Sequence, residues 1–147
     1  MHDDLQDLPV LLLSAARALV DGIDAGVREA GFTDVRPAHG YAFARLSGTG
    51  ATVTELAEHL EITKQAASQM AEELIGKGYV KRTPHPTDAR ARLLVLTEKG
   101  HACTRAADDA AAAALSPLAR SLTPAEARSL RSALRHLATP GRIRPLW

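Results

Sequence analysis

Aromatic residues make up only 3% of this 147-residue sequence, while hydrophobic residues as a whole reach 46%, with alanine and leucine the most frequent. A core with few aromatic rings is typical of close-packed helices rather than of an aromatic-rich β-sandwich. A chain of this length fits one domain on the usual allowance of roughly 100 to 200 residues. The composition therefore predicts a single, mainly α-helical domain over residues 1–147.

Long apolar runs are also missing. The mostly apolar stretch Leu8 to Ala16 ends at Arg17, well short of the ~20 residues that a membrane span needs. The residues before it are acidic, unlike those of a signal peptide. A single cysteine, Cys103, cannot form a disulfide within the chain, which agrees with a reducing compartment. We therefore expect a cytoplasmic protein that does not contact a membrane.

Signatures of catalysis and of metal binding are missing as well. We find no nucleophile with its base, no phosphate-binding loop and no dinucleotide fingerprint. The segment 48–50 (Gly-Thr-Gly) is too short to be a phosphate-binding loop or a dinucleotide fingerprint.

His101 and Cys103 are two residues apart on a predicted helix and point to different sides, so they do not form a zinc site. Only the fold could bring His39 to His101. Cys103 has no second cysteine to resolve a sulfenic acid, which favours an inert helix residue over a redox sensor. We expect no cofactor, no metal and no enzymatic activity, and a small helical enzyme is the last of our alternatives.

The net charge of +1 hides an uneven distribution of charge. Residues 1–34 contain seven acidic side chains against two arginines, whereas residues 63–100 contain seven lysines and arginines against four acidic side chains. The electrostatic footprint of a nucleic-acid site is local and need not dominate the total charge. The middle of the chain is therefore the candidate region for such a site.

Helical periodicity and capping residues divide the chain into short elements. Thr52 and Glu55 have the spacing of a capping box, and Thr63 can cap a further helix that glycines at 76 and 78 stop. Two short β-prone runs follow, with a polar loop between them, and Thr97 and Thr123 then begin two more helices. The expected helices are 8–30, 37–46, 53–60, 64–75, 98 to about Ser116-Pro117, and 124 to about Ala138; the expected strands are 79–83 and 92–96.

This order predicts a winged helix-turn-helix, in which the second helix of the pair enters the major groove of DNA. The polar face of the helix after Thr63 suits that task. Glutamine amides can pair with adenine, a lysine can reach guanine or phosphate, and a helix start favours phosphate. The alternative is an ordinary solvated helix face. The candidate residues are Thr63, Lys64, Gln65, Ser68 and Gln69.

The predicted hairpin carries a second basic group, formed by Arg82, Arg90 and Arg92. Arginine is favoured in narrow minor grooves, which a flexible hairpin tip can enter. Asp88, two residues before Arg90, could hold its guanidinium through a bidentate pair. The alternative is a charged, solvated hairpin with a weak surface pair.

These blocks together resemble the winged helix-turn-helix of the multiple antibiotic resistance regulator (MarR) family. The resemblance implies a homodimer, with residues 35–97 as the DNA-binding lobe, 1–34 and 98–147 as dimerisation helices, and Arg90, positioned by Asp88, in the minor groove. The family often has arginine directly after that aspartate, where this chain has Ala89. The matching stretches are 53–57 (VTELA), 63–68 (TKQAAS), 74–79 (LIGKGY), 88–90 (DAR) and 96–100 (LTEKG).

The resemblance also implies a function: a sequence-specific transcriptional regulator, as a ligand-responsive repressor, that binds palindromic double-stranded DNA. Relatives often bind phenolic or other aromatic compounds between the dimerisation helices and the DNA-binding lobe. The alternative is a winged helix for non-specific DNA binding or for protein contacts, which would show little dependence on DNA sequence. The residues expected around an effector are Leu12, Arg17, His39, Tyr41 and Arg45.

Overall fold

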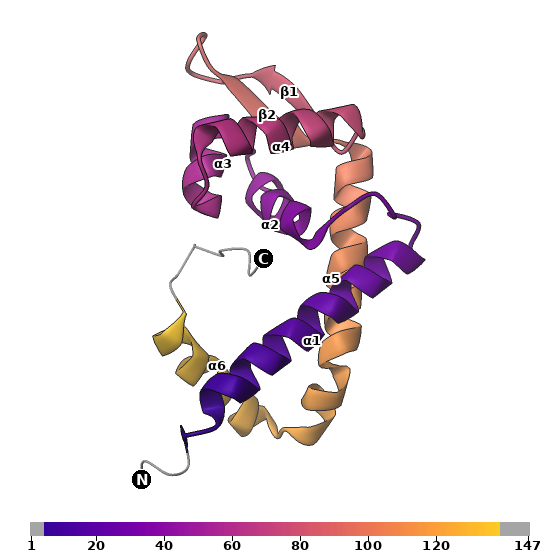
Figure 1. The fold of residues 1–147 in the computed structure, drawn as a ribbon, viewed down its shortest axis with the longest axis vertical. Coiled ribbons are helices and arrows are strands. Elements are labelled where there is room, and N and C mark those ends of the chain that lie inside the picture. The colour runs from indigo at the N-terminus through magenta and orange to yellow at the C-terminus, as the bar shows by residue number, and fades with distance from the viewer. Residues whose placement is uncertain (1–4, 139–147) are drawn as a thin grey trace.

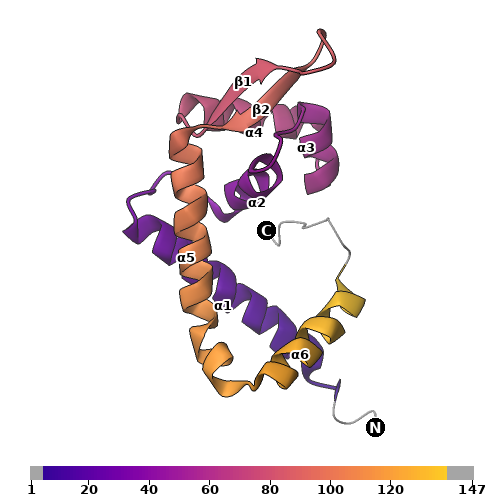
Figure 2. The same cartoon turned by 180° about the vertical axis from the view of Figure 1, so that it is seen from behind.

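The computed structural model describes residues 5–138, in which helices and a hairpin form two parts (Figure 1). One part is the lobe of α2, α3, α4 and the hairpin, and the other is built from α1, α5 and α6. α5 leads away from the lobe and crosses α1, and α6 lies at its far end in both views (Figures 1 and 2). The elements are α1 (Leu8–Glu29), α2 (Pro37–Leu46), α3 (Val53–Leu60), α4 (Lys64–Gly76), β1 (Val80–Pro84), β2 (Arg92–Leu96), α5 (Glu98–Ser121) and α6 (Pro124–Leu137).

The predicted fold class, a mainly helical chain with one small antiparallel hairpin, is confirmed within the described residues. The expected end of the fifth helix near Ser116 and Pro117 is wrong, because α5 continues through Pro117 to Ser121. A proline inside a helix removes one backbone donor, but the turn after Pro117 carries two side-chain hydrogen bonds: Arg120 donates to Ser116 Oγ (2.6 Å) and Ser121 Oγ donates to the carbonyl of Leu118 (2.8 Å). Residues 1–4 and 139–147 of the predicted dimerisation segments lie outside the described residues.

Threonine caps four of these helices, as the sequence predicts. The hydroxyl of each threonine accepts the backbone N–H three residues later, at 3.1 to 3.3 Å. Glu55 and Glu126 complete two capping boxes by accepting the N–H of the threonine. Each such cap stabilises its helix by about 1 kcal/mol. The capping residues are Thr52, Thr63, Thr97 and Thr123.

The hairpin is attached to the lobe by a backbone pair that the sequence did not predict. Ala51 and Leu94 exchange two hydrogen bonds, of 3.1 and 2.8 Å, next to the β1–β2 ladder. Gly50, with φ of +78°, makes this approach possible, since a Cβ atom there would lie 2.5 Å from the carbonyl oxygen of Leu94. Leu94 is itself buried, so the base of the hairpin belongs to the core.

The core is centred on Tyr79, which is 0% exposed. Its ring lies 5.5 Å from that of Phe43 and 6.2 Å from that of Phe32, measured between centroids. Its hydroxyl donates to Asp34 Oδ1 at 2.6 Å. Burial raises the pKa of the Tyr79 hydroxyl, and the hydrogen bond to Asp34 raises it further, so the phenol stays neutral. The remaining large core residues include Leu46, Leu56, Leu60 and Leu74.

Small residues bring α1 and α5 together at their crossing. A Cβ atom at Gly26 would overlap the Cβ atom of Ala110 on α5. Any side chain at position 26 would therefore force the two helices apart, and the alanine-rich middle of α5 matches this need for small residues. Small residues on both helices therefore permit the close approach of α1 and α5.

We expect Gly26→Ala to lower the free energy of unfolding by about 1 to 3 kcal/mol, because overpacking outweighs the gain in helix propensity. Urea unfolding followed by circular dichroism, at one fixed protein concentration, measures the change. Gly40→Ala is the control: Gly40 is an exposed residue of α2 with no atom close to its missing Cβ, and alanine there should stabilise by about 0.5 to 1 kcal/mol. Equal changes in the two variants would contradict the packing argument.

Candidate nucleic-acid interface

The outer face of α4 is polar, and its inner face is part of the core. Ala67, Ala71 and Leu74 are buried on the inner face. Lys64, Gln65 and Gln69 are exposed and Ser68 is half-buried. Together with Glu72 and with Val53 of α3, these four outer residues line a shallow groove between α3 and α4. The structure therefore brings the predicted base-reading residues onto one surface.

The start of α4 is electrostatically open to an anion. Thr63 caps the helix by accepting the N–H of Ala66 at 3.1 Å, so its hydroxyl shapes the helix start. The first turn contains Lys64 and no acidic residue. A helix N-terminus carries a partial positive charge, and Lys64 adds to it. This end of α4 suits a phosphate group.

An ion pair joins the hairpin to α4. Arg82 of β1 binds Glu72 of α4 through its guanidinium. Arg92 is exposed and lies opposite Pro84 in the β1–β2 register. No ion pair within residues 5–138 engages Lys64, Arg90 or Arg92. Arg82 is therefore held in place by a carboxylate, and the other three cations remain available to a polyanion.

The turn of the hairpin differs from the expectation in how Asp88 acts. Its carboxylate accepts the backbone N–H of Arg90 at 2.9 Å rather than pairing with the guanidinium. A spacing of two residues favours this local Asx turn, and both residues are exposed. Nδ1 of His85 accepts the N–H groups of Thr87 and Asp88 at 3.2 and 3.1 Å. Asp88 thus orders the backbone that carries Arg90 and leaves the guanidinium free of that pair.

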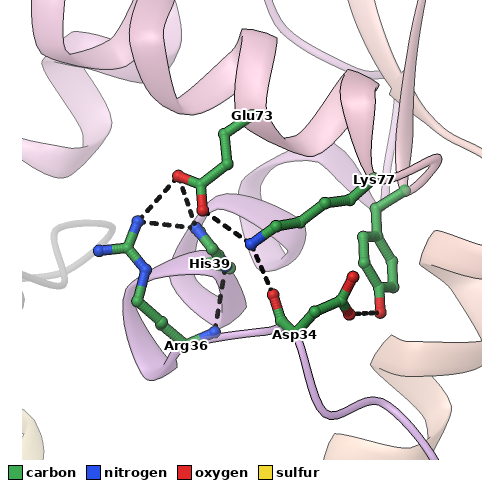
Figure 3. A network of polar contacts seen from close by, with 6 residues as sticks. Asp34, Arg36, His39, Glu73 and Lys77 are labelled. Atoms are coloured by element: carbon green, nitrogen blue, oxygen red, sulfur yellow. Dashed lines mark hydrogen bonds and ion pairs between the residues drawn. The ribbon is translucent and has the colours of Figure 1, made fainter.

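Behind α4 lies a polar cluster that the sequence did not predict, formed by Asp34, Arg36, His39, Glu73 and Lys77 (Figure 3). Glu73 Oε2 accepts from Arg36 at 2.9 Å, and Glu73 Oε1 accepts from Lys77 at 2.7 Å. Lys77 Nζ also donates to the carbonyl oxygen of Asp34 at 2.7 Å. The hydrogen bond from Lys77 is the main cause that lowers the pKa of Glu73. The only signal in the sequence was the four-residue spacing of Glu73 and Lys77.

A cavity of about 270 Å³ lies between α1, α2 and α5. Its wall is mainly apolar and includes Ile23, Val27, Phe43 and Ala107. Tyr41 also lines it, and burial raises the pKa of the Tyr41 hydroxyl. The cavity therefore has the size and lining of a site for a small, largely apolar molecule.

Of the five residues predicted around an effector, Tyr41 alone lines this cavity. His39 lies in the polar cluster and is 0% exposed. Arg45 donates to the carbonyl of Gly50 at 2.9 Å, beside the hairpin base. Arg17 is exposed on α1 and pairs with Asp21, and Leu12 is half-buried on α1. The structure thus does not bring the five together, and their assignment to an effector stays a prediction.

Cys103 lines the same cavity and is 1% exposed. Burial raises the pKa of its thiol to about 11. Because the thiolate is the reactive form, this position disfavours oxidation chemistry. The structure agrees with the expectation of an inert helix residue.

The described residues also bear on metal binding and on membrane insertion. Within residues 5–138, no group of three or more histidine, cysteine, aspartate or glutamate side chains is arranged to hold a metal ion. His101 is exposed on α5, whereas His39 is buried with Arg36 and Glu73 as its partners. None of the described helices has the length and apolar character needed to cross a bilayer.

The chain is similar to known proteins in sequence and in fold. Residues 33–91 match a family model described as the MarR family. The fold is similar to that of FabT from Streptococcus pneumoniae in complex with DNA, at 20% identity and a TM-score of 0.79, covering 90% of this chain and 93% of that one. It is also similar to a mutant MarR from E. coli complexed with operator DNA, at 21% identity and a TM-score of 0.70, covering 95% and 99%. CouR from Rhodococcus jostii, bound to p-coumaroyl-CoA, matches at 21% identity and a TM-score of 0.70, covering 92% and 94%. A search of curated protein sequences gives no match.

We expect Cys103 to react with a thiol reagent at least about a hundredfold more slowly in the native protein than in urea, because burial limits both access and the thiolate fraction. Absorbance on reaction with Ellman's reagent at pH 8 measures the rate. Ala89→Cys in a Cys103→Ser background is the control, since Ala89 is exposed in the hairpin turn. A native Cys103 that reacts as fast as the control would contradict the burial of the thiol.

Proposed function

We propose that this chain is a winged-helix transcription regulator of the MarR family, whose family model residues 33–91 match. We further propose that it binds a specific palindromic operator as a homodimer. The observation that carries the proposal is the exposed face of α4, with Lys64, Gln65, Ser68 and Gln69, beside a hairpin that leaves Arg90 and Arg92 without an ion pair in residues 5–138. α4 supplies base contacts in the major groove, and the hairpin tip supplies contacts in the minor groove. The chain acts by occupying DNA in the cytoplasm and catalyses no reaction.

Dimer formation is supported by the apolar faces of α5 and α6. α6 contains no buried residue, yet it carries Leu130, Leu134 and Leu137 on its surface. A groove between α6 and the end of α5 is lined by Leu115 and Leu118. Exposed leucines in such a row are typical of an interface, and a second copy of the same helices offers a matching apolar surface. Two copies joined in this way would present two α4 helices to a palindrome.

We also propose that a small aromatic ligand controls this binding, which makes the protein a ligand-responsive repressor. The cavity adjoins both parts of the fold: α1 and α5 form one wall, and α2 of the DNA-binding lobe forms the other. The neighbour CouR was solved with p-coumaroyl-CoA bound. A ligand that favours one arrangement of these helices would shift the separation of the two α4 helices.

The direct test is a fluorescence-anisotropy titration against DNA from upstream of the chain's own gene, with a shuffled DNA as the reference. We expect a dimer to bind the operator at least ~10³-fold more tightly than the shuffled DNA. If the operator does not lie upstream of this gene, selection of bound sequences from random DNA identifies it. Affinity that depends steeply on salt but not on sequence would instead support the alternative of non-specific binding.

Substitutions on α4 and on the hairpin should have different effects on recognition. We expect Gln65→Ala or Gln69→Ala to reduce the preference for operator over shuffled DNA by about 1 to 3 kcal/mol for each lost bidentate contact. Arg90→Ala should weaken binding to both DNAs, with Arg105→Ala, which removes an exposed cation from α5, as its control. Equal losses on both DNAs for the glutamine variants would rule out their role in base reading.

A further inference from the structure

His39 is a fully buried histidine that contacts both the start of α2 and the inner side of α4 (Figure 3). Its Nδ1 accepts the backbone N–H of Arg36 at 3.1 Å, which completes the capping box of α2. Because a backbone N–H can only donate, the neutral ring must carry its proton on Nε2. Nε2 lies 3.1 Å from Nη2 of Arg36, which can only donate, and 3.5 Å from Glu73 Oε2. The carboxylate is therefore the acceptor available to the Nε2 proton.

Glu73 attaches α4 to this segment, together with Lys77, which donates to the carbonyl oxygen of Asp34. Besides facing His39, Glu73 accepts from the guanidinium of Arg36 and from Lys77. Its neighbour Glu72 binds Arg82 of the hairpin. Two successive carboxylates therefore bind α4 to two different segments. Glu72 binds the hairpin, and Glu73 binds the segment 34–39. The orientation of the exposed face of α4 depends on both.

A second proton on His39 cannot be accommodated in this arrangement. It would occupy Nδ1, which could then no longer accept the N–H of Arg36, and the cap of α2 would be lost. The groups that face the ring are Glu73, Arg36 and Lys77, so a histidinium would stand beside two cations and one carboxylate. Burial lowers the pKa of His39, with Glu73 opposing and Arg36 and Lys77 adding to the shift.

We propose that His39 and Glu73 are positioning residues for DNA recognition, which hold α4 in its DNA-reading orientation only while His39 is neutral. Neither residue touches DNA in this scheme, because the polar cluster lies behind α4. The proposal rests on the proposed function, since it concerns how the same operator is read. It makes operator binding proton-linked: acidification weakens binding through a residue outside the interface.

The test compares the wild type with His39→Gln. Glutamine at this position can accept the N–H of Arg36 through its oxygen and donate to Glu73 through its amide, and it does not titrate. Operator affinity is measured by anisotropy from pH 7.5 to 5.0 at constant ionic strength. We expect the wild type to lose affinity relative to His39→Gln by up to about tenfold per pH unit for each proton taken up. His101→Gln is the control, because His101 is an exposed histidine of α5, outside both the polar cluster and the hairpin.

Thermal unfolding over the same pH range gives a second measurement that needs no DNA. A histidine whose folded pKa is lowered contributes stability that is complete above its ordinary pKa of 6.5 and is lost as the pH falls below that value. We therefore expect the melting temperature to fall further on acidification in the wild type than in His39→Gln.

Each outcome decides one question. Operator binding that weakens on acidification in the wild type and in His101→Gln, but not in His39→Gln, supports the proposal. Specific binding at pH 7.5 with the same pH profile in wild type and His39→Gln overturns it and leaves the proposed function intact, as does a profile altered only by His101→Gln. Absence of specific binding at pH 7.5 overturns the proposed function itself.

Discussion

The burial of Tyr79 is the constraint on which the two parts of the fold depend. Its hydroxyl binds Asp34 ahead of α2, its carbonyl accepts the N–H of Thr97 at 3.0 Å, and Lys99 lies 4.3 Å from the centre of its ring. One side chain and its backbone thus join the segment after α1, the end of α4 and the start of α5. Since α5 leaves the lobe at this point, the direction of the long helices follows from how Tyr79 packs.

The same junction explains why the cavity and the polar cluster are adjacent. Arg36 lines the cavity and also binds Glu73 of α4. A displacement of the segment before α2 therefore reaches α4 directly, through one guanidinium. Coupling of this kind requires no long chain of residues, because both ends share one side chain.

Local signals were sufficient to predict most of the fold. Threonine caps, glycine stops and apolar stripes act within a few residues, and they gave the order and most bounds of the helices. The end of α5 was mispredicted because the bonds around Ser116 and Leu118 that support its last turn cannot be inferred from a proline alone. The Ala51–Leu94 pair was missed since it joins residues that are 43 positions apart in the sequence.

The candidate interface was predictable to a similar extent, and for the same reason. Lys64, Gln65, Ser68 and Gln69 share one face of one helix, so their spacing places them together. The polar cluster joins α4 to Arg36 and His39, more than thirty residues earlier, and no local pattern indicates such a contact. Asp88 accepts the backbone N–H of Arg90 rather than its guanidinium, although its spacing of two residues from Arg90 is compatible with either contact.

The hairpin is fastened at its base and free at its tip. Leu94 is buried and paired with Ala51, whereas the residues from Pro86 to Arg90 are all exposed. Substitutions in the tip would therefore leave the core unchanged and, in the proposed function, would alter only contacts with DNA. Such a division lets a lineage of regulators acquire new DNA preferences at this position without first acquiring compensating mutations elsewhere.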